Sequence, residues 1–88
     1  AVNKSAINHF TRYLSKFFKN KNIRVNTLSP GGISNNQPST FQTKYKKLAV
    51  NKGMLESKDI CGALLFLLSD NSTFVNGQNI IVDDGWIL

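Results

Sequence analysis

The residue types best suited to chemistry in this chain are a lysine near its start, two tyrosines and a Pro-Gly-Gly turn. Lys4 lies at the start of a stretch with helical spacing. A lysine within about 4–6 Å of a phenol lowers the phenol pKa from its usual value of about 10. Residues four apart on a helix share a face. Phe17 follows Tyr13 by four residues and Ala49 follows Tyr45, so neither tyrosine forms such a pair. By itself, Lys4 is best interpreted as a surface lysine.

The triplet Pro30-Gly31-Gly32 follows residues 23–28, a short segment that predicts a β-strand. Ligands of open α/β sheets bind outside the carboxyl ends of the strands. Proline fixes φ, and glycine lets the backbone approach a ligand closely. The turn is therefore a candidate ligand contact, although such a triplet alone is usually only a turn.

The elements that position these residues follow an α/β pattern. Apolar residues recur at three- and four-residue steps over residues 2–19 and predict an amphipathic helix. A second helix is predicted over 58–69, with Ser57 as its N-cap, and a second strand over 79–82. A strand, a crossover helix and a strand predict two neighbouring parallel strands.

Residues 33–55 form a long polar connection that contains a predicted short helix over residues 41–50. Connections of this length are usually functional or disordered. Parallel strands are covered by helices on both faces, and two strands with two helices do not supply that cover. The chain is therefore expected to lie within a larger doubly wound sheet.

Composition excludes several classes of protein. The 88 residues allow one domain at most, and no apolar run approaches the roughly 18 residues of a membrane span. Cys61 is the single cysteine, so an internal disulfide is excluded, and no second ligand at metal spacing accompanies it or His9. Both are expected to be packing residues. No metal and no membrane partner are expected, and the lone cysteine favours a reducing cytoplasm.

The charge is uneven along the chain. Residues 1–52 carry a net charge of +10 and residues 53–88 a net charge of −4. A basic stretch can indicate nucleic-acid binding, but no nucleic-acid motif accompanies it. We prefer the interpretation that these basic residues form a solvent-exposed face, or that acidic residues elsewhere balance their charge. No nucleic-acid partner is expected.

Four stretches together resemble the C-terminal part of the short-chain dehydrogenase/reductase family, over nearly all 88 residues. They are residues 1–6 (AVNKSA), 23–33 (IRVNTLSPGGI), 66–70 (FLLSD) and 76–85 (NGQNIIVDDG). In that family a Tyr-x-x-x-Lys pair carries the chemistry, and Lys4 matches its lysine. The resemblance implies that the tyrosine is the residue directly before Ala1, so that the chain begins one residue after the catalytic Tyr.

The resemblance implies the C-terminal portion of a doubly wound Rossmann-type parallel sheet. Residues 1–88 would be the C-terminal part of a single NAD(P)-binding domain whose N-terminal, cofactor-binding part is absent. The implied activity is hydride transfer between a nicotinamide cofactor and a carbonyl or alcohol, in a sugar or acyl-carrier derivative. Lys4 would lower the tyrosine pKa and bind the ribose hydroxyls. The nicotinamide site would comprise Lys4, Pro30, Gly31, Gly32, Ile33 and Ser34, with the Ile33 backbone on the carboxamide.

Residues 34–55 match the family's substrate loop. Its candidate substrate residues are Asn35, Gln37, Phe41, Tyr45 and Met54. For Phe41 and Tyr45 the alternative is that they only anchor a lid. The hydroxyl residue that usually follows Ile33 by two places is replaced by Asn35. Asp84 replaces the first glycine of the usual Asp-Gly-Gly motif, and Asp83 is expected to be structural.

The family's Gly-rich fingerprint, its catalytic Ser and its upstream Asn have no match in these residues, so NAD and NADP both remain open as cofactor. The resemblance implies a dimer or tetramer, formed through the helix at 2–19 and the last helix and strand. Richness in Lys and Asn favours a bacterial source. The alternative function is a non-catalytic fragment or degenerate relative with a binding or assembly role. The 88 residues alone are expected to be inactive.

Overall fold

The computed structural model describes residues 2–88, with side chains from Ser5 onward. Five helices and strands are joined by two single-turn 3-10 helices, η1 and η2. In chain order the elements are α1 (Val2–Phe17), β1 (Thr27–Pro30), α2 (Ser39–Leu48), η1 (Ser57–Ile60), α3 (Cys61–Leu68), η2 (Asp70–Ser72) and β2 (Asn79–Val82).

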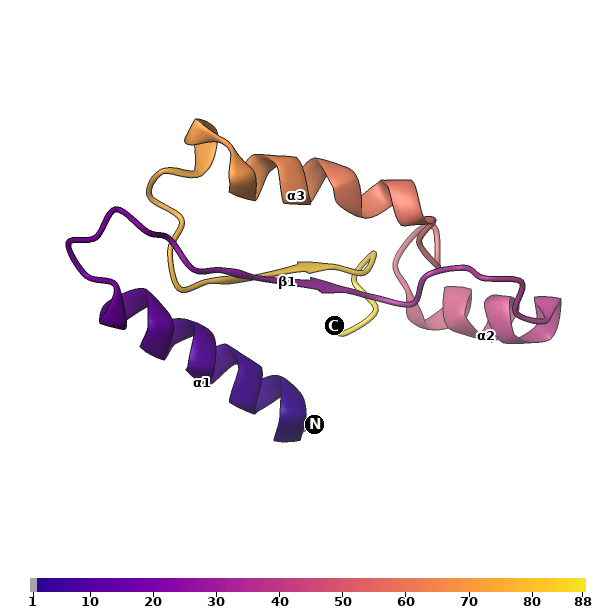
Figure 1. Cartoon of the computed structure of the whole chain (residues 1–88). Coiled ribbons are helices and arrows are strands. Elements are labelled where there is room, and N and C mark those ends of the chain that lie inside the picture. Colours follow the sequence, from indigo (N-terminus) through magenta and orange to yellow (C-terminus); the bar gives the residue numbers. More distant parts are fainter. Residues whose placement is uncertain (1) are drawn as a thin grey trace.

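The two strands lie side by side and run parallel, from Thr27 opposite Asn79 to Pro30 opposite Val82. This confirms the predicted parallel pair with a crossover between the strands. In Figure 1, α3 lies over one face of the sheet and α1 over the other, while α2 lies beyond the carboxyl ends of the strands. The residues that follow the strands therefore meet α2 at one end of the molecule.

β1 begins four residues later than the sequence predicted, and it includes Pro30. Residues 23–26, which were predicted to be the first part of the strand, lie outside the regular ladder. They are held by a backbone hydrogen bond from the Gly77 N–H to the Val25 carbonyl at 2.8 Å and by side chains. The Val25 N–H donates to Asn76 Oδ1 at 3.1 Å, and the Gln78 N–H donates to Asn26 Oδ1 at 3.0 Å. Two of the hydrogen bonds between this segment and residues 76–78 are thus made by asparagine side chains, and the regular ladder begins at Thr27.

The predicted helix over 58–69 is divided into η1 and α3, and its cap is Glu56 rather than Ser57. The Glu56 N–H donates to Asp59 Oδ2 at 2.8 Å, which is half of a capping box. α2 begins directly after Pro38, two residues earlier than predicted. It ends before Ala49, which is extended, and the Val50 N–H then donates to the Asp84 carbonyl at 2.8 Å.

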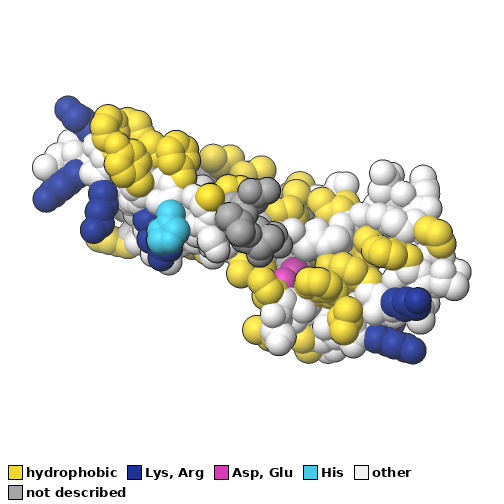
Figure 2. Space-filling view, turned by 90° about the horizontal axis from the view of Figure 1, so that it is seen from below, with side chains coloured by type: hydrophobic (Ala, Val, Ile, Leu, Met, Phe, Trp, Pro, Cys, Tyr) yellow, Lys and Arg dark blue, Asp and Glu magenta, His cyan; other side chains and the backbone are white. Residues whose placement is uncertain are grey.

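Apolar side chains are poorly covered. Among the described residues, Leu55 is the buried hydrophobic residue, and the radius of gyration is 15.2 Å. A compact domain of this length has a radius of about 12 Å. Figure 2 shows hydrophobic side chains spread across the face of the molecule that is seen from below. His9 and Cys61 are exposed, so the prediction that they are packing residues is wrong.

Between residues 2 and 88, no helix combines the length and the hydropathy required to cross a membrane.

Candidate functional site

The turn at the carboxyl end of β1 is held from two sides. The Gly31 N–H continues the ladder and donates to the Val82 carbonyl at 2.8 Å. Ile33 then forms a parallel bridge with Leu55, through the Gly32 carbonyl and the Ser34 N–H. In such a bridge the central residue's own N–H and carbonyl point away from the partner. The backbone of Ile33 therefore faces away from Leu55, as a ligand contact requires.

Tyr45 joins α2 to this turn. Its hydroxyl accepts a hydrogen bond from the Gly32 N–H at 2.6 Å. Its ring stacks on Trp86, with ring centroids 5.5 Å apart and planes inclined by 15°. Phe41 lies one helical turn earlier, half exposed, with its ring 6.5 Å from that of Tyr45. Tyr45 therefore fastens α2 to the turn, as the anchoring alternative raised from the sequence requires.

The two glycines of the turn are required by packing. A Cβ on Gly31 would lie 2.6 Å from Asp83 Cβ, and a Cβ on Gly32 would lie 2.8 Å from Cε2 of Tyr45. Contacts this short do not occur between real side chains. The sequence argument gave ligand approach as the reason for glycine here, whereas the structure shows that Asp83 and Tyr45 already occupy the space.

A pocket of about 400 Å³ opens beside the turn. Four of the predicted site residues line it: Pro30, Gly31, Gly32 and Tyr45. Ser5 and Asn8, near the start of α1, line it as well. Lys4 belongs to the first turn of α1, but its side chain lies outside the described side chains, so its predicted role stays a prediction.

Other predicted site residues, Ser34 of the cofactor set and Met54 and Gln37 of the substrate set, do not line this pocket. Ser34 and Met54 line a separate pocket of about 260 Å³, together with Lys46 and Lys52. Gln37 closes a local turn, since its Oε1 accepts the Asn35 N–H at 2.5 Å and its Nε2 donates to the Ile33 carbonyl at 3.1 Å. The structure thus brings Tyr45 and Gln37 to the turn, whereas Met54 lines a separate pocket.

Three residues of the C-terminal segment at this site were missing from the predicted set. Asp83 and Trp86 line the pocket beside the turn. Asp83 is buried, and its carboxylate accepts the N–H groups of Gly85 at 2.9 Å and Ile87 at 3.2 Å, which fits the structural role predicted for it. The third is Asp84. No periodicity marks these residues, because all three follow the last strand.

The Asp84 carboxylate is held by three consecutive N–H groups. Its Oδ2 accepts from Asn51 at 2.9 Å, from Lys52 and from Gly53 at 2.8 Å. The hydrogen bonds from Gly53 and Lys52, helped by that from Asn51, lower the pKa of the carboxyl group below its ordinary value. Partial burial opposes this shift, and the Lys52 charge adds to it. Asp84 therefore carries a negative charge at neutral pH.

Across the part of the chain that the structure describes, no three His, Cys, Asp or Glu side chains come together in a group that could hold a metal ion.

Comparison with known proteins identifies the family. A sequence model of the family described as enoyl-(acyl carrier protein) reductase matches residues 1–87. The post-translational flagellin modification protein A of Campylobacter coli is 56% identical over 86 residues, which are 98% of this chain and 34% of that protein. A D-arabinitol 2-dehydrogenase of Candida tropicalis is 33% identical, over 97% of this chain and 33% of its own length.

Among solved structures, a short-chain dehydrogenase of Leptospira borgpetersenii with bound NAD+ superimposes with a TM-score of 0.92 and 39% identity. The match covers 99% of this chain and 34% of that one. The chain belongs to the short-chain dehydrogenase/reductase family. Its fold is confirmed as the C-terminal portion of a Rossmann-type α/β sheet. It spans about a third of the length of the relatives it matches.

Proposed function

We propose that residues 1–88 are the C-terminal part of a single NAD(P)-binding domain in an oxidoreductase that transfers hydride between a nicotinamide cofactor and a carbonyl or alcohol. The observation that carries this proposal is the turn from Pro30 to Ser34. It lies at the carboxyl ends of parallel strands, in a chain matched over 99% of its length by an NAD+-bound relative. Ligands of such sheets bind at this edge.

The described residues fit one end of the cofactor. We propose that the Ile33 N–H, which faces away from the Leu55 bridge, hydrogen-bonds the nicotinamide carboxamide. The Gly-rich turn that would hold the pyrophosphate has no counterpart in these residues. When bound, the nicotinamide accepts or releases the hydride.

In this proposal, the chain supplies the cation beside the proton-transferring group. Lys4 pairs with a tyrosine directly before Ala1, keeps the tyrosine pKa low and holds the ribose hydroxyls. A positive charge a few ångströms from a phenol favours the phenolate, which makes the tyrosine an effective acid and base near neutral pH. Ser5 and Asn8, at the same end of α1, line the pocket beside the turn.

Two substrate classes are proposed, sugar or polyol derivatives and acyl-carrier derivatives. The first is supported by the similarity to the D-arabinitol 2-dehydrogenase, and the second by the match to the family described as enoyl-(acyl carrier protein) reductase. The pocket beside the turn offers both the aromatic wall of Tyr45 and Trp86 and polar groups. We further propose a cytoplasmic location and association as a dimer or tetramer through α1 and the last helix and strand.

The test is a cofactor and substrate screen on the intact protein. NAD+ and NADP+ are each offered with a set of polyols, and NADH and NADPH with 3-oxoacyl and enoyl thioesters, while absorbance at the reduced nicotinamide band is followed. Turnover with one pair, strongly reduced in the Lys4→Ala variant, is expected. An intact protein that binds neither nicotinamide cofactor would show the alternative, a non-catalytic relative, to be correct.

A further inference from the structure

The substrate loop is fastened to the C-terminal segment at two points. One point is the carboxylate of Asp84, which accepts the N–H groups of residues 51–53. The other is the ring of Trp86, which stacks on Tyr45. We call these two contacts the C-terminal clasp. The loop between Ile33 and Leu55 is also closed at its base by the bridge between those two residues.

The connection between the two points is short and rigid. Tyr45 lies one turn before the end of α2, and the Ala49 N–H donates to its carbonyl at 3.2 Å. The Val50 N–H donates to the Asp84 carbonyl at 2.8 Å. A methyl carbon of Val50 lies only 2.3 Å from the position that a Cβ on Gly85 would take, so the two residues pack closely. A shift of residues 50–53 therefore moves the end of α2 that carries Tyr45.

Asp84 adopts an unfavourable backbone conformation to make these contacts. Its φ is +55°, in the left-handed region that aspartate tolerates better than most residues and that glycine adopts freely. A glycine would fit this backbone without strain but would leave the three N–H groups without the carboxylate. The side chain therefore has a role that the backbone conformation does not explain.

We propose that Asp84 is a positioning residue that acts through Tyr45. By holding residues 51–53, it keeps the Tyr45 hydroxyl on the Gly32 N–H, and so sets the position of the Pro30–Ser34 turn. Its effect on the KM for the substrate rests on the proposed function, whereas its effect on the turn does not.

The experiment measures amide hydrogen exchange in the intact protein, because exchange reports the turn without requiring activity. The variants are Asp84→Asn, which keeps the shape and removes the charge, and Asp84→Gly, which also removes the backbone strain. Tyr45→Phe removes the acceptor for the Gly32 N–H directly. Asp70→Asn is the matched control, since it makes the same change of charge on η2, and Asp70 makes no contact with residues 51–53.

In both Asp84 variants, we expect exchange at residues 51–53 to rise about tenfold, as for loss of a charged hydrogen-bond acceptor. The exchange rate of the Gly32 N–H should also rise in the two Asp84 variants. This rise should be smaller than the one that Tyr45→Phe produces. The Asp70→Asn variant should match the wild type. In an active enzyme, KM for the substrate should rise several-fold, with kcat nearly unchanged.

A rise confined to residues 51–53, with Gly32 exchange as in the wild type, would show that Asp84 is only a local fastening and would overturn the proposal. Unchanged exchange at residues 51–53 would overturn it as well. An intact protein that shows the Gly32 effect but no oxidoreductase activity would support the positioning role and refute the proposed function.

Discussion

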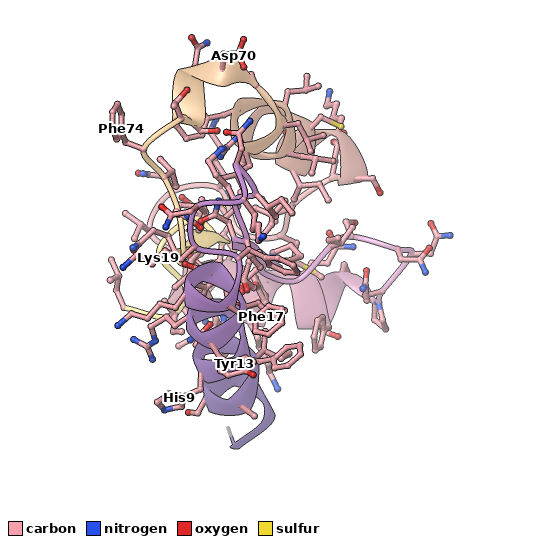
Figure 3. All side chains as sticks on the ribbon, turned by 60° about the vertical axis from the view of Figure 1, so that its left-hand side comes forward. His9, Tyr13, Phe17, Lys19, Asp70 and Phe74 are labelled. Carbon is pink, nitrogen blue, oxygen red and sulfur yellow. The ribbon has the colours of Figure 1, made fainter. Side chains whose placement is uncertain are left out.

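The contacts within the exposed face of α1 differ in kind from the contacts within the C-terminal clasp. On α1, the rings of Phe10, Tyr13 and Phe17 stack at centroid distances of 6.4 and 6.0 Å, yet each side chain is 60% exposed or more. Figure 3 shows Tyr13 and Phe17 projecting from one side of α1 and His9 from the other. These rings contact one another, and the Phe17 ring also meets that of Phe18 edge-on at 5.1 Å.

The clasp, in contrast, is formed by directional contacts between segments some thirty residues apart, which this chain makes with itself. Its carboxylate, amide and hydroxyl groups are partnered in the described structure. Only part of the architecture is therefore complete within these 88 residues. The site end has its own hydrogen bonds, whereas the apolar face of α1 lacks a partner among the described residues, and apolar patches of this kind usually mark interfaces.

The largest expected effect comes from preparing residues 1–88 alone. Their apolar faces are then exposed to water, while the residues of the clasp are all present. Residues 1–88 alone should not melt cooperatively and should not bind a nicotinamide cofactor. Burial in so small a chain barely offsets an ordering cost of roughly 1.5 kcal/mol per residue. Calorimetry and NADH fluorescence titration provide the measurements. A monomer that melts in one cooperative transition would show that the apolar faces need no partner for folding.

Substituting Lys4 tests the chemical end of α1 apart from its apolar face. In the intact protein, Lys4→Ala should lower kcat by about 10²–10⁴-fold, because Lys4 tunes the group that gives acid–base catalysis. The increase of kcat with pH that follows ionisation of the tyrosine should move to higher pH, because the tyrosine pKa returns toward about 10. Lys16→Ala, on the same helix, should have normal turnover. Near-normal turnover of Lys4→Ala at neutral pH would refute its assignment.

Removing one aromatic ring from α1 tests whether the exposed face of this helix is covered in the assembled protein. Phe17→Ala should lower the free energy of unfolding of the intact protein by about 3–5 kcal/mol if the ring is buried there, as for other large-to-small core changes. Sedimentation should show weaker association of subunits. A change within about 0.5 kcal/mol, typical of surface positions, would mean that the face is solvent-exposed.

The smallest effect concerns the charge in the clasp. The pKa of Asp84 is lower in the folded protein, so its contribution to protecting residues 51–53 is present above its unfolded pKa of about 3.9. The contribution is lost as pH falls through the lower, folded pKa. Lys52 is the charged side chain that acts on it.

We therefore expect the ratio of amide protection in the wild type to that in Asp84→Asn to be largest near neutral pH and to approach one in strong acid. Hydrogen exchange measured on both proteins at each pH cancels the intrinsic pH dependence of exchange. A ratio that stays constant across the acid range would show that the charge of Asp84 does not stabilise the clasp.

The sequence by itself determined the order of the elements, the parallel strand pair and the family. Helical spacing in α1 and α3 and the short apolar run of β2 are local patterns, and they predicted these elements to within a few residues. The motif residues around Pro30 and Asn76 likewise identified the family before any contact was known.

Only the tertiary structure decided which residues meet at the site. The start of β1 depended on the side chains of Asn26 and Asn76, and these come together only after the chain has folded. The glycines of the turn are explained by Asp83 and Tyr45, which lie far from them in sequence. Asp84 bonds residues more than thirty positions away, and no local pattern encodes such a contact, because it depends on how the end of the chain returns past α2.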